Sequence, residues 1–175
     1  MTDLDEFRAA KDEYFRNDPS SPLPHAVRAR FTGLRYYAEQ PALHLELEPE
    51  LLEDPEVVSM QTSTGDHVAY VRWAALHFAI DGQHATLTVY RDPHAGHLFL
   101  PFSDANAGGE TYSAGRYLDV MPLPDGRLLV DFNYAYNPYC AYSPDWSCPI
   151  PPAENRLDIA IRAGEQTFGT DAAGH

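Results

Sequence analysis

The chain of 175 residues is long enough to bury the core of one domain, and its 44% hydrophobic and 22% charged residues argue against global disorder. Its formal charge of −14, with Lys11 as the single lysine, makes nucleic acid a poor partner, because such a field repels phosphate. No apolar run approaches the roughly 18 residues of a membrane span, and the first twenty residues contain no apolar signal core. We therefore expect a cytoplasmic protein that does not bind membranes, with Cys140 and Cys148 as thiols.

The N-terminal residues predict the clearest helix, over about residues 3–17. Its apolar stripe recurs at helical spacing and consists of Leu4, Phe7, Ala10, Tyr14 and Phe15. Asp3 followed by Glu6 resembles a capping pair. Asp18-Pro19 ends the helix, because proline disfavours α geometry in the residue before it.

After residues 20–24 the apolar period changes to two, which indicates strands. Leu43, Leu45 and Leu47 alternate with polar residues. A long apolar run over residues 67–80 then meets Asp81-Gly82, a strong hairpin signal because both turn positions need positive φ. Further strands are expected at residues 85–91 and, after a turn at 93–96, at 97–102.

The same pattern recurs in the C-terminal half. Asp125-Gly126 precedes an expected strand at residues 127–133, of which residues 127–131 would pair with residues 117–120. Alternating Leu157, Ile159 and Ile161 indicate a last strand.

These elements predict a mainly β fold: an antiparallel β-sandwich or open barrel with the N-terminal α-helix packed on it. We expect one domain over residues 1–175, with the β domain at about 28–168 and a frayed tail from residue 169.

Two segments differ from the rest in composition. Residues 104–119 read DANAGGETYSAGRYLD, and residues 131–155 read DFNYAYNPYCAYSPDWSCPIPPAEN. Both combine hydrogen-bonding side chains with aromatic rings and turn formers, a mixture typical of pockets that orient a small ligand. At these residues the chain resembles DUF1684, a bacterial and archaeal family of unknown function. The resemblance extends to the IRAGE segment and to the Phe31–Leu34 segment, where we expect a strand. The resemblance implies one compact domain and supplies no catalytic residue.

Individual residues in these segments allow more than one role. Arg116 can bind a carboxylate or phosphate, or it can tie the loop to Glu110 or Asp131. Cys140 is expected to be a buried, inert thiol, with a nucleophile or a pair with Cys148 as alternatives.

Metal and acid–base chemistry have weaker signals. The histidines are scattered and the cysteine spacing is not that of a zinc site, so we expect no metal and no cofactor. A carboxylate pair for acid–base chemistry can be drawn from Asp104, Asp119 and Asp131. Alternatively, these aspartates make turn hydrogen bonds.

The sequence thus favours a protein that binds a small polar or anionic molecule in a pocket built from residues 104–119 and 131–155. The alternatives are a hydrolase or transferase that uses Cys140 or a carboxylate, and an interaction domain with a tyrosine-rich surface. The expected ligand-binding residues are Glu110, Tyr112, Arg116, Asn133, Asn137, Tyr139, Cys140 and Asn155.

Overall fold

The computed structural model describes residues 1–169, so the expected frayed tail lies, from residue 170 on, outside the described residues. The chain begins with helix α1 (Asp3–Asn17), as predicted, and a short second helix α2 (His25–Arg28) follows. The cap of α1 differs from the expected Asp3–Glu6 pair. The N-cap is Thr2: its hydroxyl accepts from the Asp5 backbone N–H, and the Asp5 carboxylate accepts from the Thr2 backbone N–H.

The larger sheet is antiparallel and has six strands. Its order is β2 (Glu50–Leu51), β4 (His67–Ile80), β5 (Gln83–Arg91), β6 (Leu98–Phe102) and β7 (Arg116–Asp119), and β3 (Val57–Gln61) also pairs with β4. The β4–β5 hairpin turns at Asp81-Gly82, with φ of 50° and 80°. These values confirm the prediction from the Asp-Gly pair.

A second antiparallel sheet has three strands in the order β1 (His44–Leu47), β9 (Leu128–Asp131) and β8 (Met121–Pro122). Short 3-10 turns connect or follow the strands: η1 (Pro41–Leu43), η2 (Phe132–Tyr134), η3 (Tyr139–Ala141) and η4 (Ala153–Asn155). In the described residues the two sheets do not close into a barrel. Apolar side chains from both form one core, among them Leu76, Leu87, Leu100, Leu118, Leu128 and Val130. The predicted mainly β fold is confirmed.

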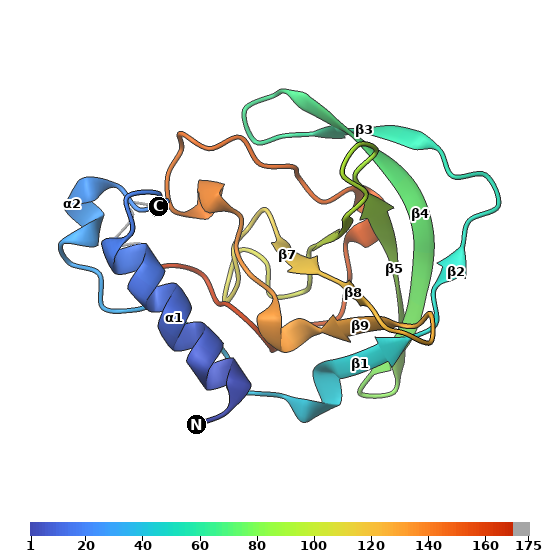
Figure 1. Cartoon of the computed structure of the whole chain (residues 1–175), viewed down its shortest axis with the longest axis horizontal. Coiled ribbons are helices and arrows are strands. Elements are labelled where there is room, and N and C mark those ends of the chain that lie inside the picture. The colour runs from blue at the N-terminus through green and yellow to red at the C-terminus, as the bar shows by residue number, and fades with distance from the viewer. Residues whose placement is uncertain (170–175) are drawn as a thin grey trace.

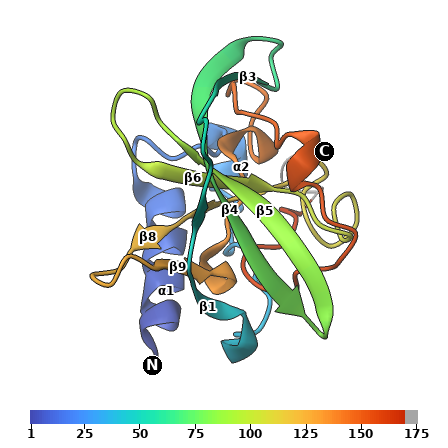
Figure 2. The same ribbon diagram turned by 90° about the vertical axis from the view of Figure 1, so that its right-hand side faces the viewer.

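Helix α1 lies alongside the three-stranded sheet, on the side away from the β4–β5 hairpin (Figures 1 and 2). Its C-terminal half is anchored by Phe15, which is 1% exposed and packs edge-on against Tyr142 with 5.0 Å between ring centroids. Its N-terminal half carries Phe7, which packs edge-on against Tyr134 at 5.0 Å. Within residues 1–169 no helix has the length and apolar content needed to cross a membrane.

Three sequence-based strand predictions are wrong. Residues 117–120 do not pair with residues 127–131, because β7 pairs with β6, and β9 pairs instead with β1 and with Met121–Pro122 of β8. In the described chain, residues 31–34 and 157–161 form no strand. The Ile161 N–H donates to the Asp104 carboxylate at 2.7 Å, so a side chain takes the place of a partner strand.

Candidate functional site

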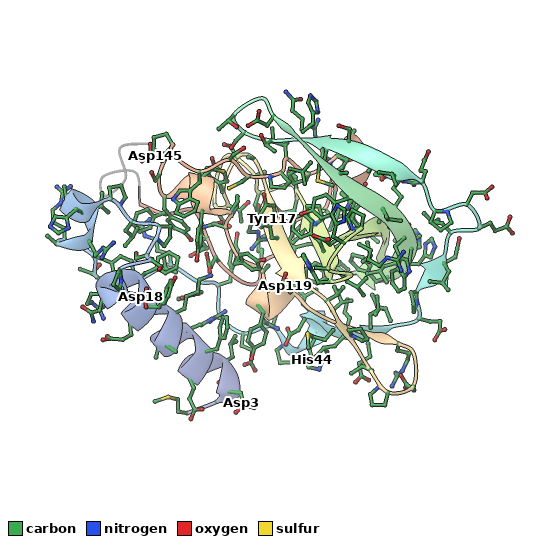
Figure 3. The ribbon with its side chains drawn as sticks, turned by 45° about the horizontal axis from the view of Figure 1, so that its top comes forward. Asp3, Asp18, His44, Tyr117, Asp119 and Asp145 are labelled. Carbon is green, nitrogen blue, oxygen red and sulfur yellow. The ribbon has the colours of Figure 1, made fainter. Side chains whose placement is uncertain are left out.

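A largely apolar cavity lies between α1 and the three-stranded sheet. It holds about 410 Å³, within the usual range for small-molecule sites. Its walls come from α1, both sheets and the segment after β9, and the lining residues are Phe7, His44, Leu118, Asp119, Met121, Leu129, Asp131, Tyr134 and Tyr136. Figure 3 places Asp119 and His44 near one another, next to the N-terminal half of α1, which Asp3 marks.

One end of the cavity holds a histidine–carboxylate pair. His44 is the first residue of β1 and Asp131 the last of β9, and the register places them opposite each other. His44 Nδ1 lies 2.9 Å from Asp131 Oδ2. The other oxygen, Oδ1, accepts from the backbone N–H and the side-chain amide of Asn133, at 3.0 and 2.8 Å. Because a carboxylate only accepts, Nδ1 of His44 carries the proton in this contact.

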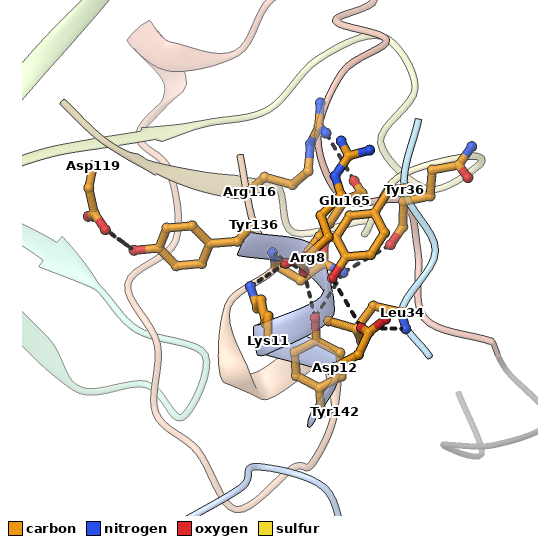
Figure 4. Close-up of polar contacts among 12 residues, drawn as sticks. Arg8, Lys11, Asp12, Leu34, Tyr36, Arg116, Asp119, Tyr136, Tyr142 and Glu165 are labelled. Atoms are coloured by element: carbon orange, nitrogen blue, oxygen red, sulfur yellow. Dashed lines mark hydrogen bonds and ion pairs between the residues drawn. The ribbon is translucent and has the colours of Figure 1, made fainter. Parts of the chain in front are cut away.

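A second carboxylate, Asp119, ends β7. The Tyr136 hydroxyl donates to both of its oxygens, at 3.1 and 3.3 Å (Figure 4). Burial raises the pKa of Tyr136, and the negative charge of Asp119 raises it further, so this hydroxyl keeps its proton at neutral pH. Asp119 is exposed and has no cationic partner within the described residues.

The cavity therefore offers acceptors and apolar walls. Among its lining residues, all within the described chain, there is no lysine or arginine. The nearby Lys11 ammonium lies 5.0 Å from the centre of the Tyr136 ring and forms an ion pair with Glu165. A molecule with an apolar body and a hydrogen-bond-donating or cationic end is the chemical complement of this lining.

Arg116 and Asn137, both expected at the site, meet on one segment, residues 163–166. Arg116 is 1% exposed and donates to the carbonyls of Ala163 at 2.5 Å and Glu165 at 3.0 Å. It also donates to the Ile161 carbonyl at 2.9 Å and pairs with Asp104 at 3.5 Å. These contacts use the guanidinium fork to hold the chain together, with Asp104 as the partner instead of Glu110 or Asp131.

The carboxylate of Glu165 is the centre of the neighbouring polar cluster (Figure 4). It is buried and accepts from the Tyr142 hydroxyl at 2.7 Å and from the Asn137 backbone N–H at 3.1 Å. Lys11 of α1 completes the cluster through its ion pair with Glu165. Since these donors come from α1 and from residues 137–142, Glu165 ties both to the C-terminal segment.

Three other expected residues lie apart from one another. The Asn133 amide pairs with the backbone of Gln40, accepting at 2.8 Å and donating at 3.0 Å. Asn155, in η4, is fully buried against β5 of the six-stranded sheet, where its side-chain amide accepts from the Thr88 N–H at 2.8 Å and donates to the Thr88 carbonyl at 2.9 Å. The exposed Glu110 accepts from the Tyr37 hydroxyl at 3.2 Å.

The last three expected residues lie close together in an aromatic cluster. Cys140 is buried, and the Tyr112 hydroxyl lies 3.6 Å from its sulfur. Tyr139 packs edge-on against Trp146, with 5.1 Å between ring centroids. Cys140 and Cys148 are both free thiols.

The comparisons with known proteins come from sequence and fold. Residues 29–166 match the family model described as a protein of unknown function, DUF1684. The chain belongs to this family. A solution NMR structure of an uncharacterized protein from Haloarcula marismortui is 39% identical, with a TM-score of 0.71. That match covers 94% of this chain and 92% of the other. A comparison with curated proteins gave no match.

The cavity of this DUF1684 protein uses the two segments predicted from composition, but different residues in them. Asp119 closes the first segment, and Asp131, Tyr134 and Tyr136 open the second. The expected ligand-binding residues do not line it, and their binding role stays a prediction. Tyr136 was missed, because only the sheet topology shows that it faces Asp119. Within residues 1–169 no group of three or more metal-ligating side chains gathers in one place.

Proposed function

We propose that this DUF1684 protein binds a small amphipathic molecule with a cationic or donor-rich end in the cavity between α1 and the three-stranded sheet. The observation that carries the proposal is that the otherwise apolar lining holds two carboxylates, Asp119 and Asp131, and no lysine or arginine among the described residues. An apolar body would replace water against Phe7, Leu129 and their neighbours.

Asp119 is the carboxylate that would meet the charged end. Asp131 already receives three hydrogen bonds, from Asn133 and His44. Asp119 receives only the Tyr136 hydroxyl and is exposed, so its oxygens have acceptor capacity left. The charge of this lining, and of the chain as a whole, favours a cation over the anionic ligand predicted from Arg116.

The alternative functions have less support. A hydrolase or transferase that uses Cys140 needs a base, and no histidine or carboxylate hydrogen-bonds to its sulfur among the described residues. An interaction domain needs its tyrosines on one exposed face, whereas Tyr142 is 1% exposed. We also propose a cytoplasmic location, which the two unpaired thiols support and cell fractionation would test.

The test measures binding of three probes of similar size by ligand-observed NMR: phenethylammonium, a neutral phenylalkyl alcohol and phenylpropionate. We expect the ammonium to bind most tightly and the carboxylate most weakly. Asp119→Asn should weaken ammonium binding about tenfold, since one partly exposed charge-assisted hydrogen bond is worth about 1.4 kcal/mol here. Asp145→Asn is the matched control, because Asp145 is exposed and lies well away from Asp119 in Figure 3.

A second pair of variants tests the cavity itself. Leu129→Trp adds bulk to the lining and should abolish binding of every probe. Leu51→Trp adds the same bulk on β2, where Leu51 is 61% exposed, and should change nothing. Equal binding of the three probes, or ammonium binding that survives Leu129→Trp, would contradict the proposal.

A further inference from the structure

The two cysteines of the chain lie against each other in an aromatic cluster that shares Tyr136 with the proposed ligand cavity, although neither cysteine lines that cavity. Cys140 lies in η3, and its backbone N–H donates to the Cys148 sulfur at 3.3 Å. The Tyr112 hydroxyl lies 3.6 Å from the Cys140 sulfur. Each cysteine is 8% exposed.

Separate parts of the fold hold the two sulfurs in place. Cys148 is fixed by the turn after β3, where the Ser63 N–H donates to its carbonyl at 2.9 Å and the Ser63 hydroxyl accepts from its N–H at 3.1 Å. Two residues later, the Ile150 N–H donates to the Gln61 carbonyl at 2.8 Å. Cys140 is held by the 3-10 turn that carries it. The approach of the thiols is therefore built by tertiary structure, because seven residues separate them in the chain.

The thiols differ in acidity. The hydrogen bond from the Cys148 thiol lowers the pKa of Cys140 to about 6, and the Tyr112 hydroxyl adds to the effect against the opposing influence of burial. The same hydrogen bond between the two thiols raises the pKa of Cys148. The arrangement is one thiolate beside one protonated thiol, as in dithiols that react stepwise.

The aromatic cluster that contains the two cysteines includes six tyrosines: Tyr70, Tyr90, Tyr112, Tyr117, Tyr136 and Tyr139. Burial raises the pKa of each of them, so they stay neutral at pH 7. They bring no negative charge that would oppose a thiolate at Cys140.

We propose that Cys140 and Cys148 form a redox-active dithiol that reduces small hydroperoxides. The Cys140 thiolate attacks one peroxide oxygen, the O–O bond breaks, and the products are a sulfenic acid on Cys140 and hydroxide. The Cys148 thiol then attacks the Cys140 sulfur and a disulfide forms. The S–O bond of the sulfenic acid breaks, and its hydroxyl group takes the proton of the Cys148 thiol and leaves as water. The two sulfurs together lose two electrons, which reduce hydrogen peroxide to two molecules of water. A dithiol reductant restores the thiols by exchange.

Burial sets the size of the oxidant. With both cysteine residues only 8% exposed, we expect hydrogen peroxide to reach Cys140, whereas a bulky disulfide is too large to align with it. This role departs from the inert thiol expected from sequence, because only the fold shows a proton donor beside Cys140.

The test treats the native protein with equimolar hydrogen peroxide and maps the products by mass spectrometry. We expect an internal Cys140–Cys148 disulfide, seen as a mass lower by two hydrogen atoms and reversed by dithiothreitol. Oxidised glutathione at the same concentration should react far more slowly. A native protein that forms no disulfide with peroxide, while the urea-unfolded chain does, would overturn the proposal without any variant.

Two substitutions of Cys148 separate its roles as proton donor and resolving thiol. Cys148→Ser keeps a donor, so Cys140 should still react quickly and accumulate a sulfenic acid that dimedone traps. Cys148→Ala removes the donor, and the thiolate fraction of Cys140 at pH 7 should fall by up to about 30-fold if its pKa returns to the ordinary 8.5. The rate should fall accordingly, and the midpoint of its pH profile should rise from near 6. Equal rates in the two variants, with thermal melts showing both folded, would overturn the role of Cys148 as donor.

Discussion

Replacing Arg116 with methionine should be among the most damaging single changes in this protein. The substitution keeps most of the hydrocarbon volume but removes the charge and every donor of the guanidinium. Arg116 is 1% exposed, and its partners are the Asp104 carboxylate and the carbonyls of Ala163, Glu165 and Ile161. Each of these partners is nearly inaccessible to water, so water cannot replace the lost donors.

The expected cost follows from what the variant leaves behind. Removing one partner of a buried ion pair costs about 3–5 kcal/mol, because the other charge stays buried without compensation. Asp104 would retain only the Ile161 N–H at 2.7 Å and the Thr111 hydroxyl at 3.2 Å. Burial lowers the pKa of Arg116 and Asp104 opposes that shift, as expected if each charge depends on the other. Adding Asp104→Asn removes the uncompensated charge and should recover roughly 1–3 kcal/mol of the loss.

Urea unfolding at pH 7 of the two single variants and the double variant completes the cycle. Arg127→Met is the matched control, since Arg127 pairs with Asp125 and Glu46 while 41% exposed and should cost less than about 1 kcal/mol. An Arg116→Met protein as stable as Arg127→Met would refute the reasoning. So would a double variant that is destabilised by the full sum of the two single changes.

Four further changes test the fold by independent routes. Gly82→Val should lower stability by about 1 kcal/mol or more, since φ is 80° there, and an unchanged urea midpoint would contradict the turn. Gly164→Ala should lower the free energy of unfolding by about 1–3 kcal/mol more than Gly126→Ala in the same assay. A Cβ at residue 164 would lie 2.7 Å from the Ala135 carbonyl oxygen, whereas the described residues leave open space at Gly126. Asn155→Leu should lower stability by about 2–4 kcal/mol in thermal melting, because the backbone of Thr88 and the Pro101 carbonyl lose buried hydrogen-bond partners. A change in stability near zero would mean that packing, not hydrogen bonding, holds η4. The hydrogen bonds from Arg72 lower the pKa of Glu154 in the folded protein. This pair therefore stabilises the fold fully above the unfolded-state pKa of about 4.3, and the stabilisation is lost as the pH falls through the lower pKa of the folded state. Arg72→Gln should therefore differ from the wild type above pH 5, by less than about 1 kcal/mol at this partly exposed site, and the two should converge in acid.

The elements that the sequence predicted well are those whose signal is local. Helix α1 follows from an apolar stripe at helical spacing, and the β4–β5 hairpin follows from Asp81-Gly82. The predictions that failed needed knowledge of a partner. Leu157, Ile159 and Ile161 alternate as a strand would, but the alternation reflects one-sided burial. The Ser103 carbonyl accepts from Leu157 and the Ala105 N–H donates to Ile159, but the Asp104 side chain takes the next N–H, that of Ile161, so no regular strand forms.

The candidate site was predictable as two segments but not as a set of side chains. Composition marks where polar and aromatic residues gather, but it does not show which of them face a cavity. Arg116 was the strongest candidate because arginine binds anions, yet its donors are used by the chain itself. Asp119 and Tyr136 meet only because β7 pairs with β6 and the chain then returns beside it after β9.

One backbone contact positions both proposed sites. Tyr117 and Tyr136 exchange backbone hydrogen bonds at 2.8 and 2.9 Å. The Tyr136 hydroxyl reaches Asp119 at the cavity, while the Tyr117 ring packs in the aromatic cluster that contains the two thiols. A change that breaks this pairing would therefore disturb ligand binding and thiol chemistry together and could not separate them. Asp119 and Cys148 take no part in this backbone pairing. Substituting Asp119 should therefore weaken ligand binding and leave thiol chemistry, and substituting Cys148 should do the reverse.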